Sequence, residues 1–330
     1  MPRPRFGLVI SPTITSKSTP AIAASLSLSQ LSMSDLKKLS QRANRLLDRL
    51  EKFLPYEQPE PDWQAAYAFR WCKYSNTYHA GGYIQAIHHP HPITLSALCG
   101  IDEQKQRIEQ NTRQFVQGFS ANNVLLTGAR GTGKSSLIKA LLNQYAQDGL
   151  RLIEVEKHHL VDLHDIVEKI DQRPERFILF CDDLSFESDE PGYKALKVVL
   201  DGSIATVSDN VLIYATSNRR HMVPELMRDN LDTQHIGEEV HPSETVEEKI
   251  SLSERFGLWL SFYPFDQDHY LEIAYYLLRH YGIYKMTPSI YAAALQWALL
   301  RGSRSGRVAW QFARDWAGQQ QSLKASRNDS

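Results

Sequence analysis

Near its middle the chain reads Asn122-Asn123-Val124-Leu125-Leu126-Thr127-Gly128-Ala129-Arg130-Gly131-Thr132-Gly133-Lys134-Ser135-Ser136. This segment predicts a short apolar strand, a glycine-rich turn, and a helix that continues to Tyr145. Residues 128–135 match G-x-x-x-x-G-K-S, the phosphate-binding loop. Glycines let successive backbone N–H groups curl around phosphate oxygens, and the helix N-terminus behind them adds partial positive charge. The segment therefore predicts a nucleoside triphosphate site.

Individual roles follow from the chemistry of the loop. Lys134 would reach the outer phosphates, and the hydroxyl of Ser135 would bind Mg²⁺. Arg130 lies at the tip of the loop, where its side chain could face either the nucleotide or a neighbouring subunit. The expected nucleotide-binding residues here are Gly128, Ala129, Arg130, Gly131, Thr132, Gly133, Lys134, Ser135 and Ser136.

Composition describes an ordinary globular protein. The 330 residues are 42% hydrophobic and 23% charged, enough for two domains or one with extensions. The net charge of −1 gives no overall attraction to nucleic acid or to anionic membranes. The three cysteines form no C-x-x-C pair, and no apolar run reaches membrane-spanning length. We expect a cytoplasmic protein with reduced thiols and no membrane partner.

Strands and helices alternate around the loop. Apolar strands are predicted at 150–155, 177–181 and 211–216, with helices between them. The strand at 177–181 is almost wholly apolar, as expected for a central strand covered on both faces. This order predicts an α/β fold, a doubly wound parallel sheet that binds ligands at the carboxyl ends of its strands.

The remaining segments flank this sheet. Amphipathic spacing predicts a helix at 36–53, whose basic residues could contact nucleic acid or lipid phosphates, although a solvated face is the simpler interpretation. The aromatic residues of 62–98 are expected to pack onto the next domain. The predicted division is a disordered leader at 1–32, an N-terminal helical and aromatic region at 33–97, the α/β nucleotide-binding domain at 98–257, a C-terminal helical lid at 258–318 and a polar tail at 319–330.

Two carboxylates directly follow the apolar strand at 177–181. Beside the loop, Asp182 would hold Mg²⁺, and Asp183 would orient or deprotonate the attacking water. The alternative is an aspartate pair that only caps a helix or forms a turn.

Polar and basic residues further along complete the candidate site. Asn218, or Thr216, would contact the attacking water or the γ-phosphate, unless the segment is a plain turn. Arg255 would stabilise transition-state charge, supplied from a neighbouring subunit. Arg307 would reach the phosphates from the lid. Taken singly, each arginine would more simply be a surface residue.

These features together resemble the AAA+ ATPases, a class of P-loop NTPases. The resemblance implies a Walker A motif at 128–135, a Walker B motif at 177–183, sensor 1 at Asn218, an arginine finger at Arg255 and sensor 2 at Arg307. Gly100 and Ile101 are similar to the segment that lines the adenine pocket in that class. Residues of about 62–285 resemble more closely a bacterial family of uncharacterised AAA+ ATPases, a domain of unknown function.

One departure from the AAA+ pattern concerns the Walker B motif, which here ends Asp182-Asp183 instead of Asp-Glu. The Asp-Asp ending resembles replication initiators and helicase loaders, and favours slow, switch-like turnover. The resemblance implies an Mg²⁺-dependent ATP hydrolase that forms a homo-oligomeric ring and remodels a protein or nucleic acid. The alternatives are an ATP-bound switch or adaptor with little hydrolysis, and a small-molecule phosphotransferase.

Overall fold

The computed structural model divides into two units, residues 1–57 and 58–330. It describes residues 33–51, 60–74, 81–185, 190–201, 209–218, 235–236, 239–240 and 252–328. The expected leader at 1–32 lies outside the described residues. Within the first unit α1 (Met33–Glu51) is the predicted amphipathic helix. Its leucines at 36, 39, 46 and 47 are each about half exposed.

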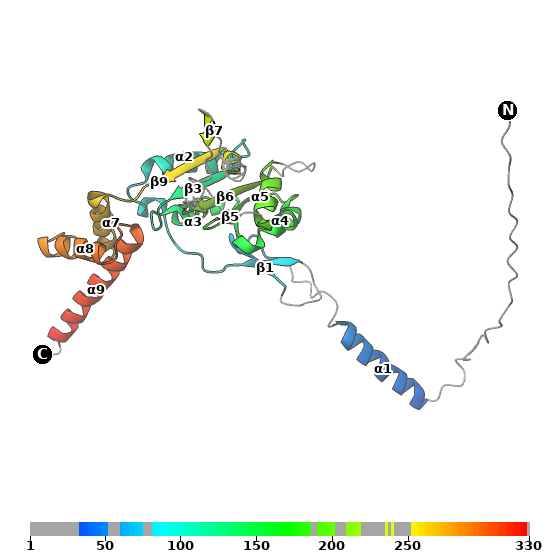
Figure 1. Ribbon diagram of the computed structural model, residues 1–330. Helices are drawn as coiled ribbons and strands as arrows, with labels where there is room; N and C mark the ends of the chain where they lie inside the picture. Colours follow the sequence, from blue (N-terminus) through cyan, green and yellow to red (C-terminus); the bar gives the residue numbers. More distant parts are fainter. Residues whose placement is uncertain are drawn as a thin grey trace, which may run out of the picture. The chain divides into compact units, whose positions relative to one another are not determined.

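A seven-stranded sheet forms the centre of the second unit (Figure 1), in the order β2-β1-β4-β5-β6-β3-β9. Only β1 and β2 pair antiparallel; the other neighbours are parallel. The strands are β1 (Ala68–Lys73), β2 (Gly82–Ala86), β3 (Val124–Gly128), β4 (Leu150–Glu154), β5 (Arg176–Cys181), β6 (Val211–Ser217) and β9 (Leu258–Phe262). Two further short strands, β7 (His235–Ile236) and β8 (Glu239–Val240), pair with each other.

Helices cover both faces of the sheet, because alternate residues of its central strands face opposite cores. In β5, Phe177 and Leu179 join one core, and Ile178 and Phe180 join the other. The first core includes residues of α4 (Leu163–Ile170) and α5 (Pro191–Asp201), and the second includes residues of α2 (Asp102–Val116) and α3 (Lys134–Tyr145). This is the predicted doubly wound P-loop fold, in which β6 separates the strand before the loop from the strand that ends in the carboxylates.

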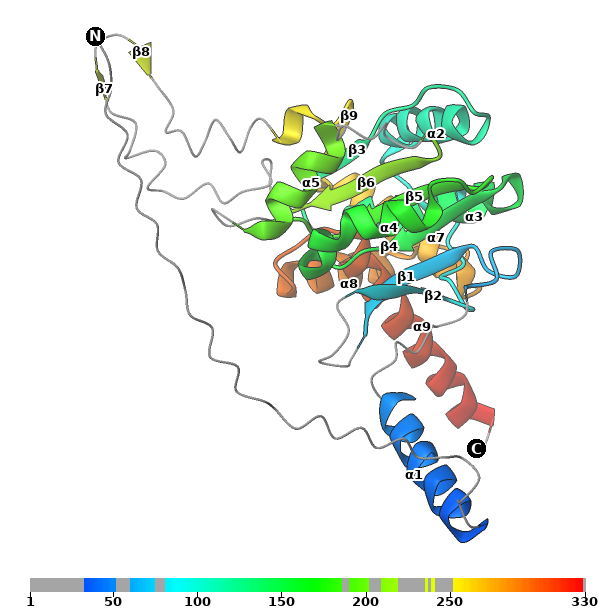
Figure 2. The ribbon, with the colours of Figure 1, turned by 90° about the vertical axis from the view of Figure 1, so that its right-hand side faces the viewer.

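The sheet is wider than the sequence predicted. The aromatic region at 33–97 was expected outside the nucleotide-binding domain, yet β1 and β2 extend the sheet at one edge (Figure 2), next to β4. Trp71 and Phe69 of β1 are 1% and 0% exposed. β1 joins the sheet because these aromatic side chains are buried in the first core. The sequence did not show this, because they become core residues only through the pairing of β1 with β4.

Both boundaries of the predicted lid also differ. The segment 258–262, assigned to the lid, is β9, which pairs with β3 along its whole length. The tail, expected to fray from residue 319, is helical to the end of α9 (Gly306–Asn328). Before β9, residues 252–254 are helical.

A third core holds the helical lid together. It joins α7 (Gln267–His280), α8 (Pro288–Leu300) and α9 around side chains such as Tyr270 and Phe312, both at most 2% exposed. Figure 1 shows these three helices grouped at one end of the α/β unit. No helix in the described part of the chain combines the length and the apolar character needed to cross a bilayer.

Candidate nucleotide-binding site

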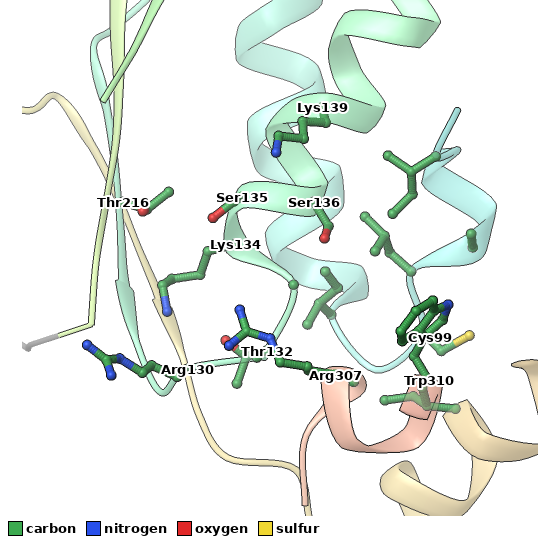
Figure 3. A pocket seen from close by; sticks show the side chains of 18 of the residues that line it. Cys99, Arg130, Thr132, Lys134, Ser135, Ser136, Lys139, Thr216, Arg307 and Trp310 are labelled. Atoms are coloured by element: carbon green, nitrogen blue, oxygen red, sulfur yellow. The ribbon is translucent and has the colours of Figure 1, made fainter. Parts of the chain in front are cut away.

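A cavity of about 870 Å³ lies at the carboxyl ends of β3, β5 and β6, with the lid on its other side (Figure 3). The loop, the carboxylates, the polar end of β6 and the lid arginine all contribute to its lining. Its lining includes residues 130–136 of the loop, Asp182, Asp183, Thr216, Asn218 and Arg307.

The loop conformation depends on its glycines. Gly128 has φ +127°, and a Cβ atom there would lie 1.9 Å from the carbonyl oxygen of Phe262 in β9. Gly131 and Gly133 also have positive φ, +75° and +98°. Only glycine reaches these conformations without strain. Gly128 and Ala129 do not line the cavity; instead their carbonyl groups accept hydrogen bonds from Lys134 at 2.7 and 2.8 Å.

Lys134 begins α3 with its side chain almost wholly buried. Its Nζ also donates to Oδ1 of Asn218 at 3.1 Å, so it links the loop to the end of β6. Burial lowers the pKa of Lys134 from 10.5 to about 8, although the charges of Asp182 and Asp183 oppose the shift. A phosphate would have to replace these hydrogen bonds, and its charge would favour the protonated amine.

Asp182, which directly follows β5, connects the loop to the end of β6. Its Oδ1 accepts a hydrogen bond from Oγ of Ser135 at 2.6 Å and another from Oγ1 of Thr216 at 2.6 Å. The same Thr216 hydroxyl accepts from the backbone N–H of Asp183 at 2.9 Å. One hydroxyl therefore positions both carboxylates, a role of Thr216 that was not predicted from the sequence.

Asp183 has a left-handed backbone, with φ +53°, the only positive value at a non-glycine residue in the described part of the chain. Its Oδ1 accepts a short hydrogen bond from Nδ2 of Asn218. Its Oδ2 lies 3.7 Å from the guanidinium of Arg130. Both carboxylate oxygens are thus engaged, and Asp183 is held in a strained conformation of the kind found at functional sites.

The lid contacts the loop directly. The backbone N–H of Gly306 donates to the carbonyl oxygen of Gly131 at 2.8 Å, and a Cβ on Gly131 would lie 2.9 Å from the side chain of Ser305. Ser305 caps α9 by accepting from the N–H of Val308. This contact places Arg307 in the first turn of α9 and in the cavity lining (Figure 3).

Apolar residues form the part of the cavity suited to a base. Ile101 lines it as predicted, whereas Gly100 does not; Gly100 instead turns the chain with φ +73° against Phe265. Figure 3 places Cys99 and Trp310 on the opposite side of the cavity from Arg130. Most of this wall was not predicted from the sequence, although Trp310 lies one helical turn after Arg307. The apolar residues are Ile93, Ala97, Leu98, Ile101, Phe265, Ile273, Leu277 and Trp310.

Arg255, the expected arginine finger, does not line the cavity of its own chain. Its Nε donates to Oδ1 of Asp201 at the end of α5. The side chain is 24% exposed.

The residues present fit a nucleotide and a magnesium ion. Ser135 and Asp182 bring a hydroxyl and a carboxylate oxygen together, the hard donors that Mg²⁺ prefers. The glycines and Lys134 would form a phosphate cradle, and the apolar wall has the character that a base would need.

Several solved structures are similar to the chain, whereas no curated protein matches it. Thermotoga maritima RuvB, a Holliday junction branch migration motor, is 15% identical over 68% of this chain and 63% of that chain, with a TM-score of 0.45. A single-residue variant of that protein has the same values. Aeropyrum pernix Orc1, in complex with DNA, is 14% identical over 64% of this chain and 58% of that chain, with a TM-score of 0.46. The chain thus spans less than two thirds of the length of these proteins.

A family model covers most of the second unit, from the aromatic segment before β1 into α9. The match extends over residues 64–320. It therefore includes the loop, both carboxylates, Arg255 and Arg307. The chain belongs to the family described as "Protein of unknown function (DUF815)".

Proposed function

We propose that this protein is an Mg²⁺-dependent ATP hydrolase of the AAA+ class. One observation carries the proposal: hydrogen bonds join Lys134 and Ser135 of the loop to Asp182, Asp183 and Asn218 at the ends of two strands. The hydroxyl of Thr216 makes the set continuous, because it contacts both Asp182 and the backbone of Asp183. A phosphate loop alone would serve many reactions. Carboxylates and an amide next to the outer phosphates suit hydrolysis, because they can hold Mg²⁺ and a water molecule.

Each residue has a defined role in this proposal. Lys134 binds the outer phosphates, and Ser135 with Asp182 holds Mg²⁺, which would neutralise phosphate charge when bound. Asp183 orients the attacking water and accepts its proton, and Asn218 positions Asp183 through the hydrogen bond between them. Arg307 contacts the phosphates from α9, so that the lid responds to the nucleotide.

The proposal includes a homo-oligomer, a ring or an open helix, that remodels a protein or nucleic acid. Arg255 supports it, because this arginine lies outside the cavity of its own chain and would complete the site of a neighbour. A cytoplasmic location is also part of the proposal, supported by the three free cysteines, Cys72, Cys99 and Cys181.

Steady-state ATP hydrolysis tests the proposal. Wild type should hydrolyse ATP only with Mg²⁺, and Lys134→Ala should abolish both binding and turnover. Arg255→Ala should keep nucleotide affinity and lose turnover about 10³-fold, the usual effect of a missing arginine finger. Lys194→Ala on the outer helix α5 is the matched control and should behave as wild type. Unchanged turnover in Arg255→Ala, or a monomeric ATP-bound form by light scattering, would refute the intersubunit arrangement.

A second candidate function is an ATP-bound switch that barely hydrolyses. The contacts of both Asp183 oxygens, with Asn218 and Arg130, favour it, because an attacking water would have to replace one of them to reach the carboxylate. The side chain of aspartate is also shorter than that of the glutamate usual at this position in AAA+ ATPases, which likewise favours slow hydrolysis. Tight ATP binding with negligible turnover in wild type, and higher turnover in Asp183→Glu, would support the switch. Rapid turnover in wild type would exclude it.

A further inference from the structure

A cluster of potential metal ligands lies apart from the nucleotide site, in the turn after β4. It consists of Glu156, His158 and His159, none of which lines the nucleotide cavity. Their ligand atoms all lie within 4.8 Å of one another, and Nε2 of His158 is 3.2 Å from Oε2 of Glu156. It is the only group of three such side chains in the described part of the chain.

The turn that carries this cluster is well anchored. Residues 157–162 form the 3₁₀ helix η4 (Lys157–Asp162), and the N–H of His159 donates to the carbonyl oxygen of Glu156 at 2.8 Å. The next residue, Leu160, is fully buried against Gly192 of α5. Asp162 is buried too, and its carboxylate accepts a hydrogen bond from Nε1 of Trp71 at 3.0 Å. The backbone under the three ligands is therefore held in place, which lowers the entropy cost of binding an ion.

His159 has an unused ligand atom. Its Nδ1 is buried and has no hydrogen-bond partner among the described residues, an arrangement that calls for a ligand or a water. Lys73, the nearby cation, is paired with Asp162 at 2.6 Å, which offsets its repulsion of an incoming ion.

We propose that Glu156, His158 and His159 bind one divalent transition-metal ion, of which Zn²⁺ is the best match. Two imidazoles and one carboxylate are a ligand set that zinc accepts, whereas Mg²⁺ prefers oxygen ligands alone. The ligands at positions 156 and 158 are largely solvent-exposed, so the remaining coordination positions are open to water or to a ligand group. This site does not depend on the proposed ATP hydrolysis.

Metal titration tests the site directly. Tag-free, full-length protein, kept in excess Mg²⁺ and reducing agent, is titrated with ZnCl₂ by calorimetry and with CoCl₂ by visible absorption. We expect one ion per chain, with affinity reduced about tenfold or more in His158→Ala and in His159→Ala. Glu156→Gln should weaken binding in the same direction.

Two adjacent, exposed histidines, His88 and His89, provide a matched control. The double variant His88→Ala/His89→Ala should keep the wild-type affinity and stoichiometry. The proposal is overturned if wild type binds no ion, or if affinity falls in this control and not in the His158 and His159 variants. His158→Gln, which preserves the size of the side chain, replaces His158→Ala if circular dichroism shows the latter to be unfolded.

Discussion

The lowered pKa of Lys134 makes nucleotide affinity depend on pH in a defined way. In the free protein the amine titrates at about 8, because burial disfavours its charge. Bound phosphate would keep it protonated far above that value. Affinity is then fully present below about pH 8, and it declines tenfold per pH unit above it.

The size of the effect follows from this pKa. Between about pH 7.5 and pH 9.5, the fraction of protonated Lys134 in the free protein decreases about 25-fold, so the dissociation constant should increase by the same factor, about 1.9 kcal/mol. A lysine at the ordinary value of 10.5 would change it by only about a tenth. The free energy of unfolding changes in the opposite direction to nucleotide affinity. It rises with pH over the same range, because the unfolded chain keeps the proton up to about pH 10.5. Weaker binding at high pH would therefore not reflect unfolding.

Calorimetry with a non-hydrolysable ATP analogue measures this dependence. Near pH 8, repeating the titration in buffers of different ionisation enthalpy should reveal uptake of about half a proton per site. Lys134→Arg keeps its charge throughout and should give a flat profile. Cys99 also lines the cavity, but burial raises the pKa of its thiol, and Cys99→Ser should retain the wild-type profile. A dissociation constant that is constant from pH 7.5 to pH 9.5 in wild type would refute the reasoning.

Further substitutions test the geometry of the site and of the core. Gly128→Ala should lower the free energy of unfolding in urea by roughly 2 to 4 kcal/mol, because its Cβ would meet the carbonyl of Phe262. Gly149→Ala, also at positive φ but with open space, should lose only about 1 to 2 kcal/mol; equal losses would contradict the contact. Thr216→Val should lower kcat about 10- to 100-fold, with Thr216→Ser near wild type. Tyr214→Phe should cost about 1 to 3 kcal/mol, measured by urea denaturation, because its buried hydroxyl bonds to two side chains of α2; no loss would mean that those side chains find other partners.

Local sequence was sufficient for the central elements. The apolar runs of β3, β5 and β6, each ending at polar or glycine residues, predicted the strands. They also predicted that the candidate site residues would lie at the carboxyl ends of these strands. The lid was predicted to be helical, and in the structure the side chain of Thr287 caps α8 by accepting from the N–H of Ile290. These features depend on residues close together in the chain, so periodicity alone reveals them.

Contacts between segments far apart in the chain could not be predicted from the sequence. Phe69 and Trp71 looked like a separate aromatic region, and only their pairing with β4 makes them core residues. Thr216 was predicted, as an alternative to Asn218, to contact the attacking water or the γ-phosphate. Only the strand order shows that its hydroxyl binds the Asp182 carboxylate and the backbone N–H of Asp183. Gly100 was expected to line the adenine pocket, yet it is absent from the lining of the cavity.

The sequence by itself determined which groups are candidates for the site: a match to the phosphate-binding loop, two carboxylates, an amide and two late arginines, in one order along a doubly wound sheet. Spacing and residue type were enough, because the loop and the strand ends are local structures. Only the tertiary structure decided where these groups meet. It pairs Lys134 with Asn218 and places Arg307 in the cavity, while Arg255 pairs with Asp201 outside it. The physical reason is that strand order and lid packing depend on burial between segments far apart in sequence, which no local pattern records.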